Sequence, residues 1–407
     1  MEMKINICML LGLRYEEKTQ VYPTYEILSY ITNFGHDVTW MVSSEETKEV
    51  QETTFNDIRV FVVPCRYREV FLKVVTKVLY ALRRMRFVFK NFKEEKYNMI
   101  FVRNGMFDAL LALYIKRRYK VPFVFEMDNP IEQSWETRKF YSKHKCFWYL
   151  ISKIATYLAV HILCKTDLVL PISKWLKEDF AKKGIKRSKM IPLPEGINPN
   201  RFSNTNEKEI IKRDGLENSR VVIYIGTMDK MRHLDVLIHA FSKVRANKEN
   251  VKLLMVGDGT DRANLERLAS KLEIEDDVIF TGQVPFEEVP NFIAAADVCV
   301  SAVPPLDFYK LSSPIKILEY MAMAKPVVAN EKIPDHEGII EESGGGILVT
   351  FYDVSFANGI MELLDNPEMA KEMGQRGREW VVNNRSYEIL ARRLEERYLK
   401  LLAKEEE

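Results

Sequence analysis

The sequence predicts an α/β protein built from two doubly wound parallel sheets, one in each half of the chain. Three observations favour this fold class. Short apolar runs alternate with helical segments over the first 200 residues, the alternation stops in a polar, asparagine-rich segment at 195–208, and it then starts again. Strands separated by helices form β-α-β units, and such units assemble into parallel sheets. The length of 407 residues agrees with two domains.

Six apolar runs in the first half are expected to be strands. They lie at 3–11, 37–42, 58–63, 98–102, 122–126 and 167–171. Gly35 is expected to end the first helix, because a glycine often stops a helix just before the next element begins. In the second half, the expected strands lie at 221–226, 251–259, 277–282, 297–302 and 326–330.

The expected domains cover residues 1–203 and 204–385, and a final amphipathic helix covers 386–407. Doubly wound sheets bind ligands in the crevice outside the carboxyl ends of their strands. The expected place for chemistry is therefore a cleft between the carboxyl ends of the two sheets.

The composition is that of an ordinary globular protein, with 47% hydrophobic and 29% charged residues. Five scattered cysteines form neither a disulfide nor a zinc pattern, so a reducing cytoplasm is the expected compartment. The formal net charge of +2 hides an asymmetry. Residues 1–200 hold 33 Lys+Arg and 22 Asp+Glu, whereas the remaining residues hold 27 and 36. The two halves are therefore expected to meet different partners, or at least to face different electrostatic fields.

Residues 146–164 form an apolar stretch long enough to raise the question of a membrane span. Lys153 lies near its middle, where a lysine costs about 2.5–3.5 kcal/mol on insertion. We therefore expect a soluble or interfacial helix here. Residues 5–13 are too short an apolar run for a signal peptide.

The stretch SSPIKILEYMAMAKPVVAN at 312–330 places a lysine and a glutamate at the start of an apolar helix. Ser313 is expected to be the N-cap, with Pro314 at the first helical position. Lys316 then lies in the first turn, where the helix dipole disfavours a cation by about 0.3–1 kcal/mol. Either Lys316 and Glu319 form a weak i,i+3 ion pair, or an anion and hydroxyl groups dock at this helix start.

Three other strand ends carry glycine-containing loops. The first has Gly226 followed by Lys230 and Arg232. These two cations either bind a diphosphate or are simply solvated residues of a loop. The second reads Val256-Gly257-Asp258-Gly259. The third reads Gly282-Gln283-Val284-Pro285, whose backbone can meet a flat base or form a simple turn. The first is not a Walker A motif.

Together and in this order, the four segments resemble family 4 of the GT-B glycosyltransferases, which are retaining enzymes with nucleotide-sugar donors. The matching residues are Gly226 with Lys230 and Arg232, Val256–Gly259, Phe280–Gly282, Leu318–Ala322 and Pro326–Ala329. Residues 166–202 resemble the last strand, helix and turn of the family's first domain. The resemblance implies a GT-B fold, in which two Rossmann-like domains face each other across a cleft. It also implies that the final helix packs back on the first domain.

The resemblance implies roles for individual residues. Lys230 and Arg232 would bind the donor diphosphate as catalytic cations, and Glu319 would accept hydrogen bonds from the ribose hydroxyls. Val284 would present its backbone to the base. The other positions expected to line the substrate sites are Gly12, Gly226, Thr227, Gly257, Asp258, Ser313, Pro314, Ile315 and Lys316. Lys316 would tolerate the helix dipole because phosphate or the transferred sugar offsets it.

The second half departs from the family pattern in two places. Leu311 stands where the family often has a first glutamate, so the role of holding the sugar hydroxyls is unassigned. Asp307 or Ser312–Ser313 are the candidates for that role. Thr227 stands where the family often has an arginine, which leaves Arg232 to supply that charge.

The first half also departs from the pattern. Gly12 is the single glycine where the family often has a Gly-Gly loop, and Asp128 lies near the position of the family's histidine. Asp128 is a third catalytic candidate that would orient the sugar or the acceptor hydroxyl, or else it caps a helix. The chain has no Asp-x-Asp triplet for a divalent metal, the nearest match being Glu126-Met127-Asp128. We expect fixed cations to stabilise the leaving diphosphate, with neither metal nor cofactor and with retention of configuration.

Basic residues concentrate in the first half, where residues 51–120 carry 16 Lys+Arg against 6 Asp+Glu. Within 70–93, Lys73, Lys77 and Arg84 fall on one helical stripe. Such a helix can lie on an anionic bilayer, or can be a crossover helix with a solvated basic face. We expect peripheral contact with the inner face of the cell membrane and no nucleic-acid partner, since no nucleic-acid motif accompanies the charge.

The expected function is transfer of a sugar from a UDP- or GDP-sugar to a lipid-linked or glycan acceptor. The alternatives are a nucleotide-sugar epimerase, an inverting transferase, or a non-catalytic scaffold subunit of the same fold. The donor's base and sugar, the acceptor, the linkage and the oligomeric state stay open at this stage.

Overall fold

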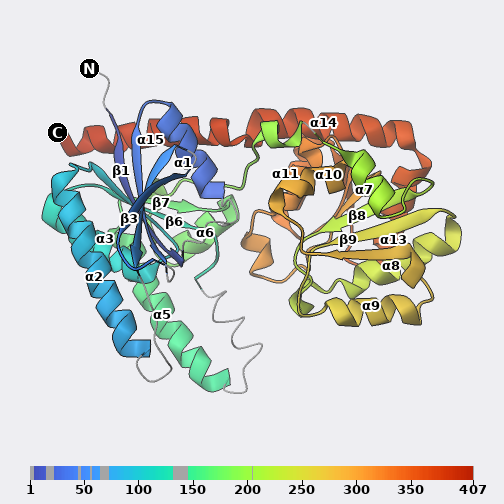
Figure 1. Ribbon diagram of the computed structural model, residues 1–407, viewed down its shortest axis with the longest axis horizontal. Coiled ribbons are helices and arrows are strands. Elements are labelled where there is room, and N and C mark those ends of the chain that lie inside the picture. Colours follow the sequence, from blue (N-terminus) through green and yellow to red (C-terminus); the bar gives the residue numbers. More distant parts are fainter. Residues whose placement is uncertain are drawn as a thin grey trace. The chain divides into compact units, whose positions relative to one another are not determined.

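The structure is a computed structural model that describes residues 4–14, 23–44, 47–55, 57–64, 73–131, 145–203 and 205–406. It divides into two compact units, one formed by Met1–Pro194 with Tyr387–Glu407 and the other by Glu195–Ser386. Each unit contains one sheet with helices packed on it (Figure 1). The division falls at Pro194 and not at residue 203, because Ile197 and Phe202 are buried in the core of the second unit.

The first unit holds a seven-stranded sheet in the order β3-β4-β2-β1-β5-β6-β7. Its strands are β1 (Asn6–Arg14), β2 (Asp37–Ser44), β3 (Gln51–Phe55), β4 (Ile58–Pro64), β5 (Met99–Arg103), β6 (Phe123–Met127) and β7 (Leu168–Pro171). All pairs are parallel except β3 with β4, which is antiparallel. The six predicted strands are present. The edge strand β3 was not predicted, because its sequence QETTF is polar and mostly exposed.

Helices cover both faces of this sheet (Figure 1). They are α1 (Pro23–Asn33), α2 (Lys73–Glu94), α3 (Met106–Tyr119), α5 (Lys145–Lys165), α6 (Lys174–Lys182) and α15 (Tyr387–Glu406). α1 and α15 lie on one face, where the buried Tyr398 of α15 joins the core. His36 and Glu395 approach to 2.7 Å beside this contact. α2, α3 and α5 lie on the other face. They connect strands that progress toward β7, whereas α1 connects β1 to β2 in the opposite direction across the sheet, and right-handed crossovers place such helices on opposite faces.

The predicted basic stripe of α2 is only partly available to a partner. Arg84 lies 2.9 Å from Asp108 of α3 and donates a hydrogen bond to the Met41 carbonyl, so it is an internal side chain. The side chains of Lys73 and Lys77 lie outside the described part of the chain. Among the described helices, none is long and apolar enough to cross a membrane.

The second unit holds a six-stranded parallel sheet in the order β10-β9-β8-β11-β12-β13. Its strands are β8 (Arg220–Ile225), β9 (Val251–Val256), β10 (Val278–Gly282), β11 (Val298–Ser301), β12 (Val327–Asn330) and β13 (Gly346–Val349). The first five were predicted, whereas the short edge strand β13 was not. Strand order reverses between β8 and β11, and such a switch point is where an open α/β sheet forms its ligand crevice.

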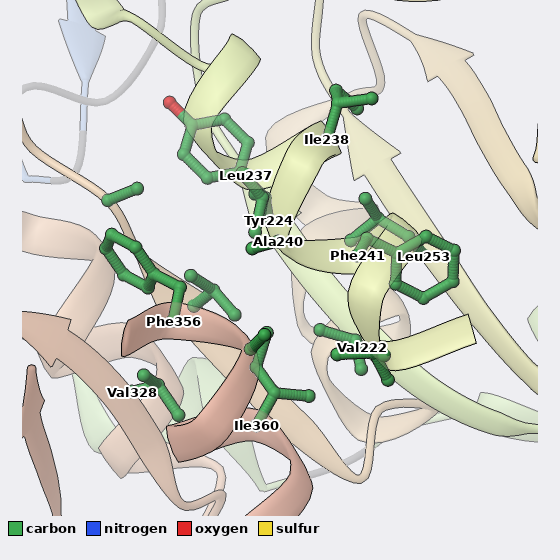
Figure 2. Close-up of a cluster of buried hydrophobic side chains, with 14 of the residues drawn as sticks. Val222, Tyr224, Leu237, Ile238, Ala240, Phe241, Leu253, Val328, Phe356 and Ile360 are labelled. Carbon is green, nitrogen blue, oxygen red and sulfur yellow. The ribbon is translucent and has the colours of Figure 1, made fainter. Parts of the chain in front are cut away.

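The helices of this unit are α7 (Glu207–Arg213), α8 (Asp235–Asn247), α9 (Arg262–Lys271), α10 (Val289–Ala294), α11 (Ile315–Ala322), α12 (Pro334–Ser343), α13 (Asp353–Asp365) and α14 (Pro367–Arg385). Figure 2 shows the core that α8 and α13 form against the sheet, to which α8 contributes Phe241 and α13 contributes Phe356. Both rings are fully buried, which stabilises the unit by about 1.5–3 kcal/mol each. The same core includes Tyr224 of β8 and Val300 of β11, the two strands at the switch point.

Candidate active site

The loops after β8, β9 and β10 are joined to one another through their backbones. The Gly226 amide donates to the Val256 carbonyl at 2.9 Å, and the Gly257 amide donates to the Gly282 carbonyl at 3.0 Å. Gly257 has φ +129°, and a Cβ atom there would lie 2.2 Å from the Gly226 carbonyl oxygen. The V-G-D-G motif therefore allows two loops to touch, which a side chain would prevent.

Asp258, the polar member of that motif, is engaged locally. Its carboxylate accepts a hydrogen bond from the Gly259 amide at 2.7 Å and lies 3.5 Å from Arg262. Arg262 in turn pairs with Glu266 at 2.7 Å. The arrangement fixes the loop between β9 and α9, and it leaves Asp258 exposed at the edge of the site.

Lys316 lies against the end of β8, although 90 residues separate it from Gly226. Its ammonium is 4.0 Å from the centroid of the Tyr224 ring. A Cβ atom at Gly226 would lie 2.9 Å from the Lys316 Nζ atom, and Gly226 also has φ +147°. Glycine is therefore needed at this position both for its backbone conformation and for the close approach of the lysine.

The segment before Lys316 is anchored differently from the prediction. α11 begins at Ile315, and the cap residue is Pro314 with φ −76° and ψ 113°. Ser313 is not the N-cap, because its hydroxyl donates to the buried Asp335 carboxylate at 2.6 Å. The Ser313 oxygen accepts from the Glu195 amide at 3.3 Å and not from an amide of α11, so both hydrogen-bonding capacities of the hydroxyl serve tertiary contacts.

Asp335 also lies 2.9 Å from Arg385, the last residue of α14, in a largely buried ion pair. Arg385 further donates to the Glu195 carbonyl at 3.2 Å, and the Glu195 amide donates to the Ser313 hydroxyl at 3.3 Å. The four residues form a network that holds the start of α11. Neither Asp335 nor Arg385 belongs to a local motif, so the sequence does not predict them as site residues.

Arg232 forms the second cation of the site. It ends the 3-10 turn Lys230–Arg232 after β8, and its guanidinium lies 4.8 Å from the centroid of the Tyr309 ring. Burial, followed by the charge of Arg232, holds the pKa of Lys316 well below its usual range. The two cations are therefore close enough to repel each other, and they create a positive field where an anion can bind. Lys230 is exposed at the start of the same turn.

Glu319 lies on α11 one turn after Lys316 and is buried. Burial raises its pKa to about 7, and the charge of Lys316 opposes part of this rise. Lys316 and Glu319 thus interact, but both remain at the carboxyl edge of the sheet and not on a solvated helix face. The Lys316 side chain is suited to bind an anion, and the Glu319 carboxylate is suited to accept hydrogen bonds from hydroxyl groups.

The remaining predicted positions of the second unit lie around this edge. Thr227 is exposed, and its carbonyl accepts a hydrogen bond from Tyr224 at 3.2 Å. Val284 is half-buried in the loop after β10, against the second core of the unit. Asp307 is almost fully exposed and pairs with Lys310 at 2.9 Å. The Ser312 hydroxyl donates to the Tyr309 carbonyl at 2.7 Å.

In the first unit, Asp128 follows β6 and lies 3.0 Å from Arg103, the last residue of β5. Arg103 is buried and also lies 3.4 Å from Glu126. The helix-cap interpretation of Asp128 concerns a segment, 132–144, that lies outside the described part of the chain. Arg103 was missed, although the parallel register that aligns it with Glu126 could have indicated the contact. Gly12 lies in β1, the strand beside β5.

Within the described ranges, no group of three His, Cys, Asp or Glu side chains is arranged to hold a metal ion.

Comparison with solved structures defines the class of protein. HepE of Anabaena in complex with UDP matches with a TM-score of 0.72 at 14% identity, covering 96% of this chain and 99% of HepE. Sucrose-phosphate synthase from Thermosynechococcus elongatus matches with a TM-score of 0.74 at 18% identity, covering 98% of this chain and 100% of the synthase. The chain therefore has the two-domain GT-B fold.

Family models identify the family. The model described as Glycosyl transferases group 1 matches residues 206–380, and the model described as Glycosyltransferase Family 4 matches residues 24–201. The chain belongs to family 4 of the glycosyltransferases.

Three curated relatives, of two kinds, illustrate the activities of similar proteins. One is the GDP-mannose-dependent alpha-(1-6)-phosphatidylinositol monomannoside mannosyltransferase of Mycolicibacterium smegmatis, 28% identical over 62% of this chain and 67% of its own length. The corresponding protein of Mycobacterium tuberculosis is 29% identical, and the match spans 60% of its length. The other is the alpha-monoglucosyldiacylglycerol synthase of Streptococcus pneumoniae, 23% identical over 81% of this chain and 74% of its own length.

Proposed function

We propose that this chain transfers a hexose from a nucleoside-diphosphate sugar to a lipid-linked acceptor, with retention and without a metal. The observation that carries the proposal is the meeting of Lys316 and Arg232 with the buried Glu319 at the switch point of the second sheet. Two cations suit the diphosphate, and a carboxylate suits the ribose hydroxyls. Nucleotide ligands bind in this crevice of open α/β sheets.

The cations would act on the leaving group. As the bond from the sugar to the diphosphate lengthens, the sugar becomes oxocarbenium-like and negative charge grows on the diphosphate oxygens. Arg232 is held over Tyr309 and Lys316 over Tyr224, so neither has to reorganise as that charge develops. Preorganised cations stabilise such a transition state more than the ground state. Lys230, from its exposed position, would add a weaker contribution.

The remaining roles follow from position. The backbone at Val284 would meet the base, with Thr227, Gly257 and Asp258 bordering the nucleotide. Pro314 and Ile315 would border the phosphate at the start of α11. In the first unit, Asp128 would orient the sugar or the acceptor hydroxyl, held in position by Arg103.

The names of the relatives support a lipid acceptor, since one acts on a phosphatidylinositol mannoside and another makes a glucosyldiacylglycerol. They support no single donor, because one relative depends on GDP-mannose, whereas the structure of HepE contains UDP. The test therefore includes both a uridine and a guanosine donor.

The experiment is to incubate the protein with UDP-glucose or GDP-mannose, with and without diacylglycerol or phosphatidylinositol in vesicles. We expect one donor to bind and to release its nucleoside diphosphate faster when an acceptor lipid is present. Conversion of the free donor to its epimer without release would indicate an epimerase. Binding of neither donor would contradict the proposal and favour a scaffold.

Glu319 makes the proposed ribose contact dependent on pH. With a pKa of about 7, the carboxyl group is mostly protonated at pH 6 and mostly ionised at pH 8. The ionised form is the better acceptor for ribose hydroxyls, so the affinity for UDP or GDP should rise by up to about tenfold from pH 6 to pH 8. Calorimetric titration of wild type and Glu319→Gln measures the effect. Titration of the nucleotide phosphate is common to both proteins, so an equal rise in the variant would contradict the assignment.

A further inference from the structure

The outer surface of α3 carries an apolar stripe. Phe107, Leu110 and Tyr114 follow one another at spacings of three and four residues, and their exposed fractions are 87%, 55% and 57%. The opposite side of the helix buries Ala109 and Ala112 against the sheet. A helix packed on a sheet normally presents polar residues to solvent, so two apolar faces on one helix call for a second partner.

The outer surface of α5 continues this pattern. Its exposed apolar side chains are Tyr149, Leu150, Ile154, Tyr157 and Leu158, each at least half exposed. They follow a helical repeat, and the inner side of the helix buries Ala159 and Leu163. α3 and α5 are successive crossover helices on the same face of the sheet, with α2 beside them (Figure 1). We call these eight residues of α3 and α5 the apolar face.

Basic side chains border the apolar face. On α2, Arg83, Arg86, Lys90 and Lys93 are exposed at helical spacing. α2 lies directly beside α3, since the Phe89 and Tyr114 rings meet edge to face at 5.1 Å. The stripe on α3 itself runs into the exposed Arg117 and Arg118. On α5, the Lys153 ammonium lies 5.3 Å from the Tyr149 ring centroid.

We propose that the apolar face docks on an anionic lipid bilayer. The aromatic and aliphatic side chains would enter the boundary between head groups and acyl chains, while the bordering cations would meet anionic head groups. Charge complementarity favours this occupant over a second copy of the chain, because a symmetric contact through the same face would bring like cations together. The proposal rests on the proposed function for the identity of the acceptor, and it deepens that function by stating how the enzyme reaches a lipid.

The location of the apolar face suits that task. The amino-terminal halves of α2 and α5 extend past the strands of the first sheet (Figure 1). In a β-α-β unit this is the edge at which the strands end, and Asp128 follows β6 at the same edge. A bilayer touching Tyr149, Leu150 and Ile154 would therefore present lipid head groups beside the candidate acceptor residue.

The test is flotation with phosphatidylcholine vesicles that contain or lack phosphatidylglycerol. We expect wild type to bind the anionic vesicles, and the double variant Leu110→Glu with Tyr157→Glu to bind them at least about tenfold more weakly. The matched control is Tyr352→Glu with Val354→Glu, which replaces two similarly exposed apolar residues of the second unit. The control should bind vesicles as wild type does, and thermal unfolding should show that both variants are folded.

Donor binding and solution mass separate the outcomes. The vesicle-defective variant should bind UDP or GDP as wild type does, because its substitutions lie in the other unit. Failure of the wild-type protein to bind anionic vesicles at low salt would overturn the proposal. A second result would also overturn it: wild type is a dimer, the double variant is a monomer, and both bind vesicles equally. This result would identify a second copy of the chain as the occupant of the apolar face. Vesicle binding without donor binding would instead count against the proposed function alone.

Discussion

Replacing Arg232 by alanine is expected to lower the turnover number for sugar transfer by about 100-fold or more, which is the usual effect of removing one preorganised group that stabilises a developing anion. The guanidinium is half-buried and lies over the Tyr309 ring, near enough to Lys316 to depress the pKa of that lysine. Its charge would therefore act at short range and with little screening on the leaving diphosphate. Continuous detection of released nucleoside diphosphate measures the effect.

A control for this prediction is Arg213→Ala. The Arg213 guanidinium lies 4.9 Å from the centroid of the Phe292 ring, a contact of the same kind. It belongs to α7, which leads into the opposite, amino end of β8. Both substitutions should cost about 0.5–1 kcal/mol of cation–π stabilisation, while Arg232→Ala alone should impair turnover. An Arg232→Ala enzyme with turnover within twofold of wild type would show that the diphosphate binds elsewhere.

The sequence predicts most of the fold because buried parallel strands are apolar throughout. The predicted runs at 98–102 and 122–126 correspond to β5 and β6, whose residues are all buried. The two strands that were missed, β3 and β13, lie at the edges of their sheets. β3 reads QETTF and is polar, as the solvent-facing position of an edge strand allows, whereas β13 reads GILV and gives an apolar run of only three residues.

The candidate site was predicted in part, for a similar reason. Gly226, Arg232 and Glu319 stand in recognisable local patterns, since each loop or helix start has its own requirements. The contacts that assemble the site depend on strand order, which the local patterns do not contain. The approach of Lys316 to Gly226 requires β8 and β11 to be neighbours, and the Asp335–Arg385 pair requires α12 and α14 to meet.

The capping error at Ser313 shows how tertiary contacts override a local rule. The pattern Ser-Ser-Pro predicts an N-cap, and it would be one in an isolated peptide. In the folded unit, the same hydroxyl donates to the buried Asp335 carboxylate and accepts from the Glu195 amide. The hydroxyl therefore does not cap the helix amides, and α11 begins at Ile315 after Pro314 with no side-chain cap.

Replacing Gly257 by alanine is expected to destabilise the second unit by about 3 kcal/mol or more and to abolish nucleotide binding. The new Cβ atom would lie 2.2 Å from the Gly226 carbonyl oxygen, a backbone atom that cannot rotate away. The residue would also keep a φ of +129°, which side chains rarely adopt. Relief of the clash must move Gly226, and with it the surface on which the Lys316 ammonium lies. Urea unfolding and calorimetric titration with UDP or GDP measure the two effects.

Gly338→Ala separates this effect from the general consequence of adding a methyl group. Gly338 lies within α12, and a Cβ atom there would have no neighbour within 4 Å. Alanine should stabilise that helix by about 0.5–1 kcal/mol, because it loses less backbone entropy than glycine on folding. Nucleotide affinity should stay unchanged in this control. If Gly257→Ala were equally stable, the contact between the two loops would not constrain the fold. If it were unstable but bound nucleotide normally, the backbone at Gly226 would not form part of the site.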